Sequence, residues 1–130
     1  MSGSILLDTT IAIDHLRNGN KQLVAHLQAG GLAYLPVIAL GELCAGVERS
    51  PVPSKTLAEV WHLKASVTLL YADDVTAANY GKIYGQLSRA GTPIPQNDIW
   101  IAAFALEYQM PLATKDPHFG RVDGLVVLAW

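Results

Sequence analysis

The chain has 130 residues, of which 51% are hydrophobic and 15% charged, so it is long enough to form a core and too apolar to be disordered. No apolar run could span a bilayer, the N-terminus lacks a signal-peptide layout, and the single Cys44 excludes an internal disulfide. The formal net charge of -2 gives no overall positive field, so binding to nucleic acid requires a local patch or metal ions. We expect one soluble, cytoplasmic domain over residues 1–130.

Short apolar runs alternate with helical patterns along the chain. Strands are predicted at 4–7, 32–35, 67–71, 110–114 and 125–128. Helices are predicted from Thr9 or Thr10 to 17, at 21–29, 37–49 and 54–65, from Asp73 or Asp74 to 89, and from a cap at Asn97 to 108. This alternation predicts an α/β fold with a parallel sheet, whose ligands bind beyond the carboxyl ends of the strands.

Four acidic residues are placed where a carboxylate does not contribute to packing. Asp8 and Asp116 each come directly after a predicted strand, so both should lie at the same edge of the sheet. Asp98 falls in the first turn of a helix whose next residues, 99–106, are uncharged, as in a buried helix. Glu42 lies in an apolar stretch between two glycines, which a close approach or tight helix packing at that face would explain.

Carboxylates that converge on one cleft repel one another and stay ionised together only beside a cation. Ligand sets made of oxygen atoms alone suit Mg²⁺ or Mn²⁺ rather than zinc. Such ions polarise a phosphoryl oxygen and activate water for attack. The acidic residues therefore favour metal-dependent hydrolysis of phosphodiester bonds.

The same residues resemble a known family. The chain is similar to the PIN domain, and more closely to the VapC ribonuclease toxins of toxin–antitoxin pairs, at four motifs in order: Asp8-Thr9, Glu42-Leu43 with Gly46, Asp98 to Ala103, and Thr114-Lys115-Asp116 with Phe119. The resemblance covers essentially the whole chain, with one small departure at Lys115, where relatives often carry Arg. It implies a three-layer fold with a five-stranded parallel sheet in the order 3-2-1-4-5, flanked by helices.

The resemblance also implies an activity, a cofactor and partners. The activity is metal-dependent endoribonuclease cleavage of RNA with Mg²⁺, for which Mn²⁺ substitutes, and the partner is a small VapB-like antitoxin. By resemblance, Asp8, Glu42, Asp98 and Asp116 form an acidic quartet, with Asp8 and Asp98 as direct metal ligands. Glu42 and Asp116 would act through water, on a second ion or in orienting the attacking water. Thr114 would form hydrogen bonds within the quartet.

Two expectations concern surfaces that partners would cover. The negative quartet would attract a cation, so we expect a C-terminal segment of the antitoxin to lie over the site and insert an Arg or Lys. The large side chains Tyr80, Ile83, Tyr84 and Leu87 form a stripe at helical spacing, which is typical of a core and also suits the interface of a homodimer.

Other residues are weaker candidates. His118 is disfavoured as a catalytic residue because a metal-activated water needs no imidazole base. Asp14 and Glu107 are expected at the surface. Arg17, Lys115 and Arg121 are candidates for phosphate contacts, with solvated charges as the alternative.

Two alternative functions stay open. The first is a catalytically inactive PIN-like binding module, which the presence of all four acids disfavours. The second is a phosphoacceptor signalling domain, which requires an Asp at the end of the third strand, where this chain has Tyr71.

Overall fold

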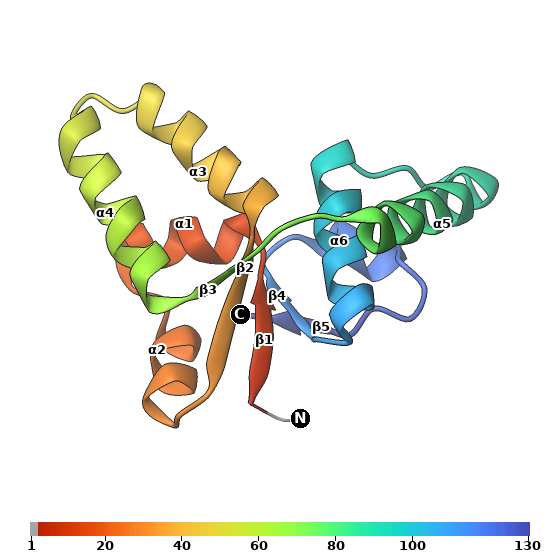
Figure 1. Cartoon of the computed structure of the whole chain (residues 1–130), viewed down its shortest axis with the longest axis horizontal. Helices are drawn as coiled ribbons and strands as arrows, with labels where there is room; N and C mark the ends of the chain where they lie inside the picture. Colours follow the sequence, from red (N-terminus) through yellow and green to blue (C-terminus); the bar gives the residue numbers. More distant parts are fainter. Residues whose placement is uncertain (1–2) are drawn as a thin grey trace.

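The computed structural model describes residues 3–130, in which strands and helices alternate (Figure 1). The strands are β1 (Ser4–Leu7), β2 (Leu32–Pro36), β3 (Thr68–Leu70), β4 (Leu112–Thr114) and β5 (Val127–Ala129). The helices are α1 (Thr9–Asn18), α2 (Lys21–Gln28), α3 (Val37–Glu48), α4 (Pro53–Ser66), α5 (Asp74–Ala90) and α6 (Gln96–Tyr108), followed by the 3-10 helix η1 (Pro117–Arg121).

The five strands form one parallel sheet in the order β3-β2-β1-β4-β5, which confirms the predicted topology. Leu7 of β1 pairs with Ala113 of β4, and the Asp8 N–H donates to the Ala113 carbonyl at 3.0 Å. The strand order reverses between β1 and β4, which makes this the topological switch point where α/β sheets bind ligands. Figure 1 shows α3 and α6 standing on opposite sides of the carboxyl ends of these strands.

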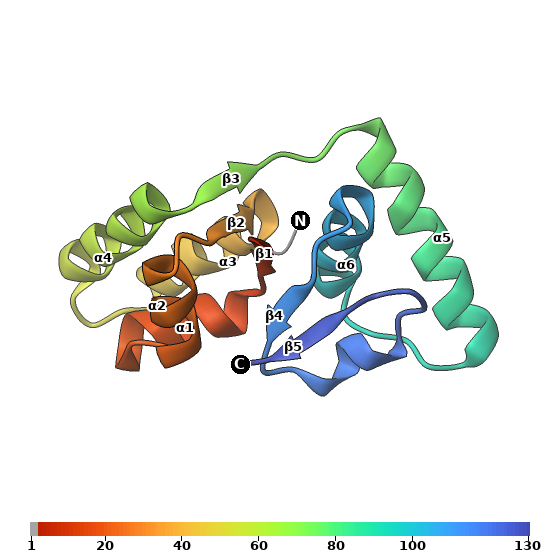
Figure 2. The ribbon, with the colours of Figure 1, turned by 90° about the horizontal axis from the view of Figure 1, so that it is seen from below.

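Helix α6 is buried, as its uncharged sequence predicted. Ile101, Ala102, Ala103 and Phe104 are all 0% exposed. Its neighbour α5 lies against it along the outside of the molecule (Figure 2). Full burial of one Phe side chain contributes about 1.5–3 kcal/mol. The packing of α6 therefore holds its first turn, and Asp98 in it, at a fixed place beside the sheet.

Several element boundaries differ from the predictions. Asn97 does not cap α6, because the cap lies two residues earlier at Pro95, whose carbonyl accepts from the Asp98 and Ile99 N–H groups. Strand β4 begins at Leu112, two residues later than predicted, because the Met110 N–H still donates to the end of α6 and Pro111 has no N–H. Strands β3 and β5 also differ from their predicted ranges by one or two residues at each end.

The predicted stripe on α5 is divided between the core and the surface. Ile83 and Leu87 are buried, whereas Tyr84 is 55% exposed. The half-buried Tyr80 packs on Trp100 of α6, with ring centroids 4.4 Å apart. The core interpretation therefore holds for the two aliphatic members, and one tyrosine stays available at the surface.

Two acids that we expected at the surface are half-exposed and accept side-chain hydrogen bonds there. The Asp14 carboxylate accepts hydrogen bonds from the Asn18 and Asn20 side chains, and these contacts hold its pKa below the ordinary value. Glu107 accepts a hydrogen bond of 2.6 Å from the Thr76 hydroxyl, which joins α6 to α5. Asn18 lies one turn along α1 from Asp14, but Asn20 lies beyond the end of that helix and Thr76 belongs to another helix. Local sequence could not show the bonds to these last two residues.

Two of the three cationic side chains that we considered for phosphate contacts donate to backbone carbonyl groups. The Lys115 ammonium donates to the Trp130 carbonyl at 3.0 Å, and the Arg121 guanidinium donates to the Pro93 carbonyl at 3.0 Å. Arg17 is exposed at the end of α1. Among residues 3–130, no helix is both long and apolar enough to cross a membrane.

Candidate active site

A cleft of about 510 Å³ opens at the carboxyl ends of β1 and β4. All four members of the acidic quartet line it, although they come from four separate parts of the chain. The lining consists of Asp8, Thr9, Thr10, Ile13, Glu42, Pro95, Gln96, Asn97, Asp98 and Asp116. The structure thus brings together the carboxylates that the sequence singled out.

Asp8 is the most buried member of the quartet, with 3% of its surface exposed. One of its oxygens, Oδ2, accepts hydrogen bonds of 2.7 Å from the hydroxyls of both Thr10 and Thr114. Asp8 also sits at the N-cap position of α1, where the helix dipole favours negative charge. These contacts fix the orientation of a carboxylate that burial alone would disfavour.

Thr114 links two members of the quartet. Its buried hydroxyl donates to Asp8 Oδ2 and accepts from the Asp116 N–H at 2.9 Å. Because Thr114 is the last residue of β4, this pair of bonds ties the end of that strand to the end of β1. The hydrogen bond within the quartet that the resemblance implied for Thr114 is therefore present.

The hydroxyls of Thr9 and Thr10 were not predicted to take part in the site. We expected one of them to cap α1, but both lie inside the helix, behind Asp8. The Thr9 hydroxyl donates to Glu42 Oε1 at 2.6 Å, and the Thr10 hydroxyl accepts from the Lys115 N–H at 3.0 Å. Two hydroxyl residues directly after a strand-terminal Asp were the sequence signal for this role.

Glu42 reaches the cleft from α3, held by Thr9. Tight helix packing does not explain the flanking glycines. A methyl group at Gly41 would meet nothing within 4 Å, and one at Gly46 would meet only the Arg49 side chain at 4.0 Å. Gly46 lines a second, neighbouring groove instead.

The pKa of Asp98 reflects the electrostatics of the cleft. Burial, followed by the negative charges of Asp8, Asp116 and Glu42, raises the pKa of Asp98 to about 7. A carboxyl so affected by three others must share one site with them. Without a cation, the folded protein holds a proton on Asp98 until the pH approaches neutrality.

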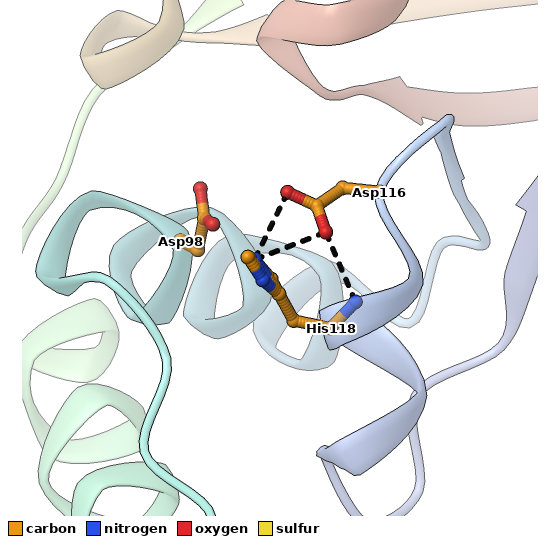
Figure 3. A group of neighbouring side chains, drawn as sticks. All are labelled: Asp98, Asp116 and His118. Carbon is orange, nitrogen blue, oxygen red and sulfur yellow. Dashed lines mark hydrogen bonds and ion pairs between the residues drawn. The ribbon is translucent and has the colours of Figure 1, made fainter.

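Asp116 contacts the imidazole of His118, a residue that the sequence did not place in the site (Figure 3). Its Oδ1 accepts from the backbone N–H of His118 at 3.0 Å, which caps η1. The ring Nε2 of His118 lies 3.0 Å from Asp116 Oδ1 and 3.2 Å from Oδ2. Asp98, Asp116 and His118 each offer one ligand atom within 4.8 Å of the others.

The donors in this cleft fit a divalent cation. The quartet supplies carboxylate oxygens, which are the ligands that Mg²⁺ and Mn²⁺ prefer. Burial and three neighbouring carboxylates raise the pKa of Asp98, so its charged form is disfavoured in the metal-free cleft. A bound cation would favour ionisation of all four acids.

Comparison with known proteins agrees with this arrangement. The sequence pattern of the PIN domain family matches residues 5–125. Ribonuclease VapC2 of Haemophilus influenzae is 30% identical over 127 residues, which cover 96% of each chain. The solved VapBC-1 of nontypeable Haemophilus influenzae has a TM-score of 0.89 and 27% identity over 98% of each chain. VapBC-5 of Mycobacterium tuberculosis, from the VapBC family of toxin–antitoxin systems, has a TM-score of 0.74 and 25% identity over 97% of this chain and 96% of its own.

The strand order and the acidic cleft at the switch point define an α/β protein with a site suited to a divalent metal. With the match to nearly its whole length, the chain belongs to the PIN domain family and, within it, to the VapC ribonucleases.

Proposed function

We propose that this protein is a metal-dependent endoribonuclease and the toxin of a toxin–antitoxin pair, acting as a single nuclease domain on RNA in the cytoplasm. One observation carries the proposal: four carboxylates from distant parts of the chain meet in one cleft, where burial and the other three charges raise the pKa of Asp98 to about 7. The similarity to ribonuclease VapC2 over 96% of each chain supports RNA as the substrate class.

The residues of the cleft divide into two groups in this proposal. Asp8 and Asp98 hold Mg²⁺, or Mn²⁺ in its place, because Asp8 is rigidly oriented and Asp98 gains most from a nearby cation. The ion supplies Lewis acidity at the scissile phosphate. Glu42 and Asp116 act beside them, through water, on a second ion or in orienting the attacking water, and each is held by its own hydrogen bond. Thr114 keeps Asp8 in position.

The test compares RNA cleavage by the wild type with that by Asp8→Asn and Asp98→Asn. Each variant keeps the side-chain shape and loses a ligand charge, so cleavage should fall by more than about 100-fold, beyond the usual effect of changing a residue that only holds a metal ligand in place. Asp123→Asn, at an exposed residue before β5, is the matched control and should cleave at the wild-type rate. Full activity in both site variants, with melting curves like the wild type, would refute the assignment.

We also propose where the antitoxin binds. A groove of about 370 Å³ between α1, α3 and α4 shares Ile13 and Glu42 with the cleft, and Leu43 and Val60 give it apolar walls. A C-terminal segment of a VapB-like partner would bury apolar side chains there and place an Arg or Lys among the quartet. That cation would replace the metal electrostatically without activating water, so inhibitor and metal would compete.

Competition between metal and antitoxin can be measured directly. The affinity of the antitoxin should fall as Mn²⁺ is raised at constant ionic strength, and cleavage should return when the inserted basic residue is changed to Ala. An affinity that does not respond to Mn²⁺, together with inhibition that survives loss of every basic residue in the segment, would show that the antitoxin works elsewhere.

Finally, we infer a homodimer. Tyr84 exposes 55% of its surface on α5, its ring stacks beside that of Tyr80 with centroids 6.4 Å apart, and aromatic side chains of this kind suit a subunit interface. Sedimentation of the wild type should give the mass of two chains. A monomer at micromolar concentration would refute the inference.

A further inference from the structure

We propose that His118 is a metal ligand, and that its Nε2 forms with Asp98 and Asp116 a mixed nitrogen–oxygen site at one side of the acidic cleft. This rests on the proposed function, because it requires a divalent cation in the cleft. A metal-activated water needs no general base, so His118 is not required in that role. Its imidazole can nevertheless bind the ion itself.

The distances suit a shared ion. Two ligand atoms at right angles, each about 2.1 Å from an octahedral ion, are about 3.0 Å apart. Nε2 of His118 lies 3.0 Å from one oxygen of Asp116, and the ligand atoms of all three residues fall within 4.8 Å. Figure 3 shows the imidazole reaching from η1 toward Asp116, with the Asp98 side chain close by.

The local chain geometry holds the imidazole in this place. Asp116 caps η1 through the His118 N–H, and Pro117 between them restricts the backbone. The next residue, Phe119, is 0% exposed and anchors η1 in the core. The His118 side chain itself is 30% exposed, so an ion from solvent can reach it.

A nitrogen donor changes which metal the site prefers. Mn²⁺ is a transition metal and accepts a nitrogen ligand more readily than Mg²⁺, which dehydrates reluctantly and keeps water and carboxylate oxygens around it. The protein should therefore prefer Mn²⁺ over Mg²⁺ by more than an all-carboxylate site would. An alternative role, in which His118 only positions Asp116 by a hydrogen bond, predicts no nitrogen bound to the ion.

Electron spin echo spectroscopy of Mn²⁺ bound to the full chain separates these roles. We expect the ¹⁴N modulation of a coordinated imidazole in the wild type and its loss in His118→Gln, which should still bind Mn²⁺. The preference for Mn²⁺ over Mg²⁺, measured by titration, should fall about 10-fold in this variant. His62→Gln, at an exposed position on α4, should keep both the modulation and the preference.

Each outcome supports or overturns the proposal. Bound Mn²⁺ without nitrogen coupling in the wild type would overturn it and leave the proposed function intact. Coupling that persists in His118→Gln would assign the nitrogen to another histidine and also overturn it. A wild type that binds no Mn²⁺ would overturn both. The wild-type spectrum decides even where His118→Gln fails to fold, and His118→Asn then serves as the second variant.

Discussion

Asp98 couples the charge of the cleft to the stability of the fold. Its pKa is raised from 3.8 to about 7, so the folded state binds a proton more tightly than the unfolded chain. Between these two pH values the folded state holds more protons, and the free energy of unfolding of the metal-free protein therefore decreases as the pH rises. Below about pH 4 the contribution vanishes, because both states are protonated.

Asp98→Asn should remove this pH dependence. In EDTA the variant should be more stable than the wild type at pH 8, where the wild-type carboxylate is ionised beside three others, and the difference should shrink at pH 5. Urea unfolding at the two pH values measures it, with Asp123→Asn as the control at an exposed acid. An equal difference at pH 5 and pH 8 would show that Asp98 does not titrate in this range.

The positions of residues that follow a strand could be predicted, because the carboxyl ends of parallel strands lie at the same edge of the sheet. Asp8 and Asp116 could be placed at one sheet edge from their positions alone, and Asp98 from the uncharged run behind it. The contacts of Thr9 with Glu42 and of His118 with Asp116 could not be predicted in the same way. They depend on side-chain orientations that only the packed elements determine.

At the scale of elements, the N-terminus of α5 helps to hold α6, the helix that carries Asp98. The sequence left open whether Asp73 or Asp74 caps α5. The structure assigns Asp73, whose carboxylate accepts from the Val75 and Thr76 N–H groups in a capping box. Thr76 in turn donates to Glu107 of α6, so this cap supports the helix that carries Asp98.

Asp73→Ala should therefore lower the free energy of unfolding, because the Val75 and Thr76 N–H groups would lose their acceptor. Asp74→Ala, one residue along, is the matched control and should change it less. Denaturant unfolding of both variants at pH 7 measures the difference. If Asp74→Ala destabilises as much as Asp73→Ala, the cap is wrongly assigned.

At the scale of the whole molecule, the topology brings four carboxylates together at one edge of the sheet, and among residues 3–130 no basic side chain lines the cleft that they form. The sheet order reverses between β1 and β4, and the quartet gathers there although the chain has a net charge of only -2. The order itself was predicted through the resemblance, since alternation of elements indicates a parallel sheet but not the sequence of its strands.

Millimolar Mg²⁺ or Mn²⁺ should raise the melting temperature of the wild type, because binding to the native state alone stabilises it and relieves the carboxylate repulsion. The gain should disappear in Asp8→Asn and persist in Asp123→Asn. A melting temperature that is the same with metal and with EDTA would argue against a cation site in the cleft.

The metal dependence of RNA cleavage tests the central claim most directly. A single-turnover assay on the purified chain should show no cleavage in EDTA, and activity should return when Mg²⁺ or Mn²⁺ is added in excess of the chelator. The same addition should not restore cleavage in Asp8→Asn. Undiminished cleavage by the wild type in EDTA would contradict a mechanism in which Asp8, Glu42, Asp98 and Asp116 act through a bound metal ion.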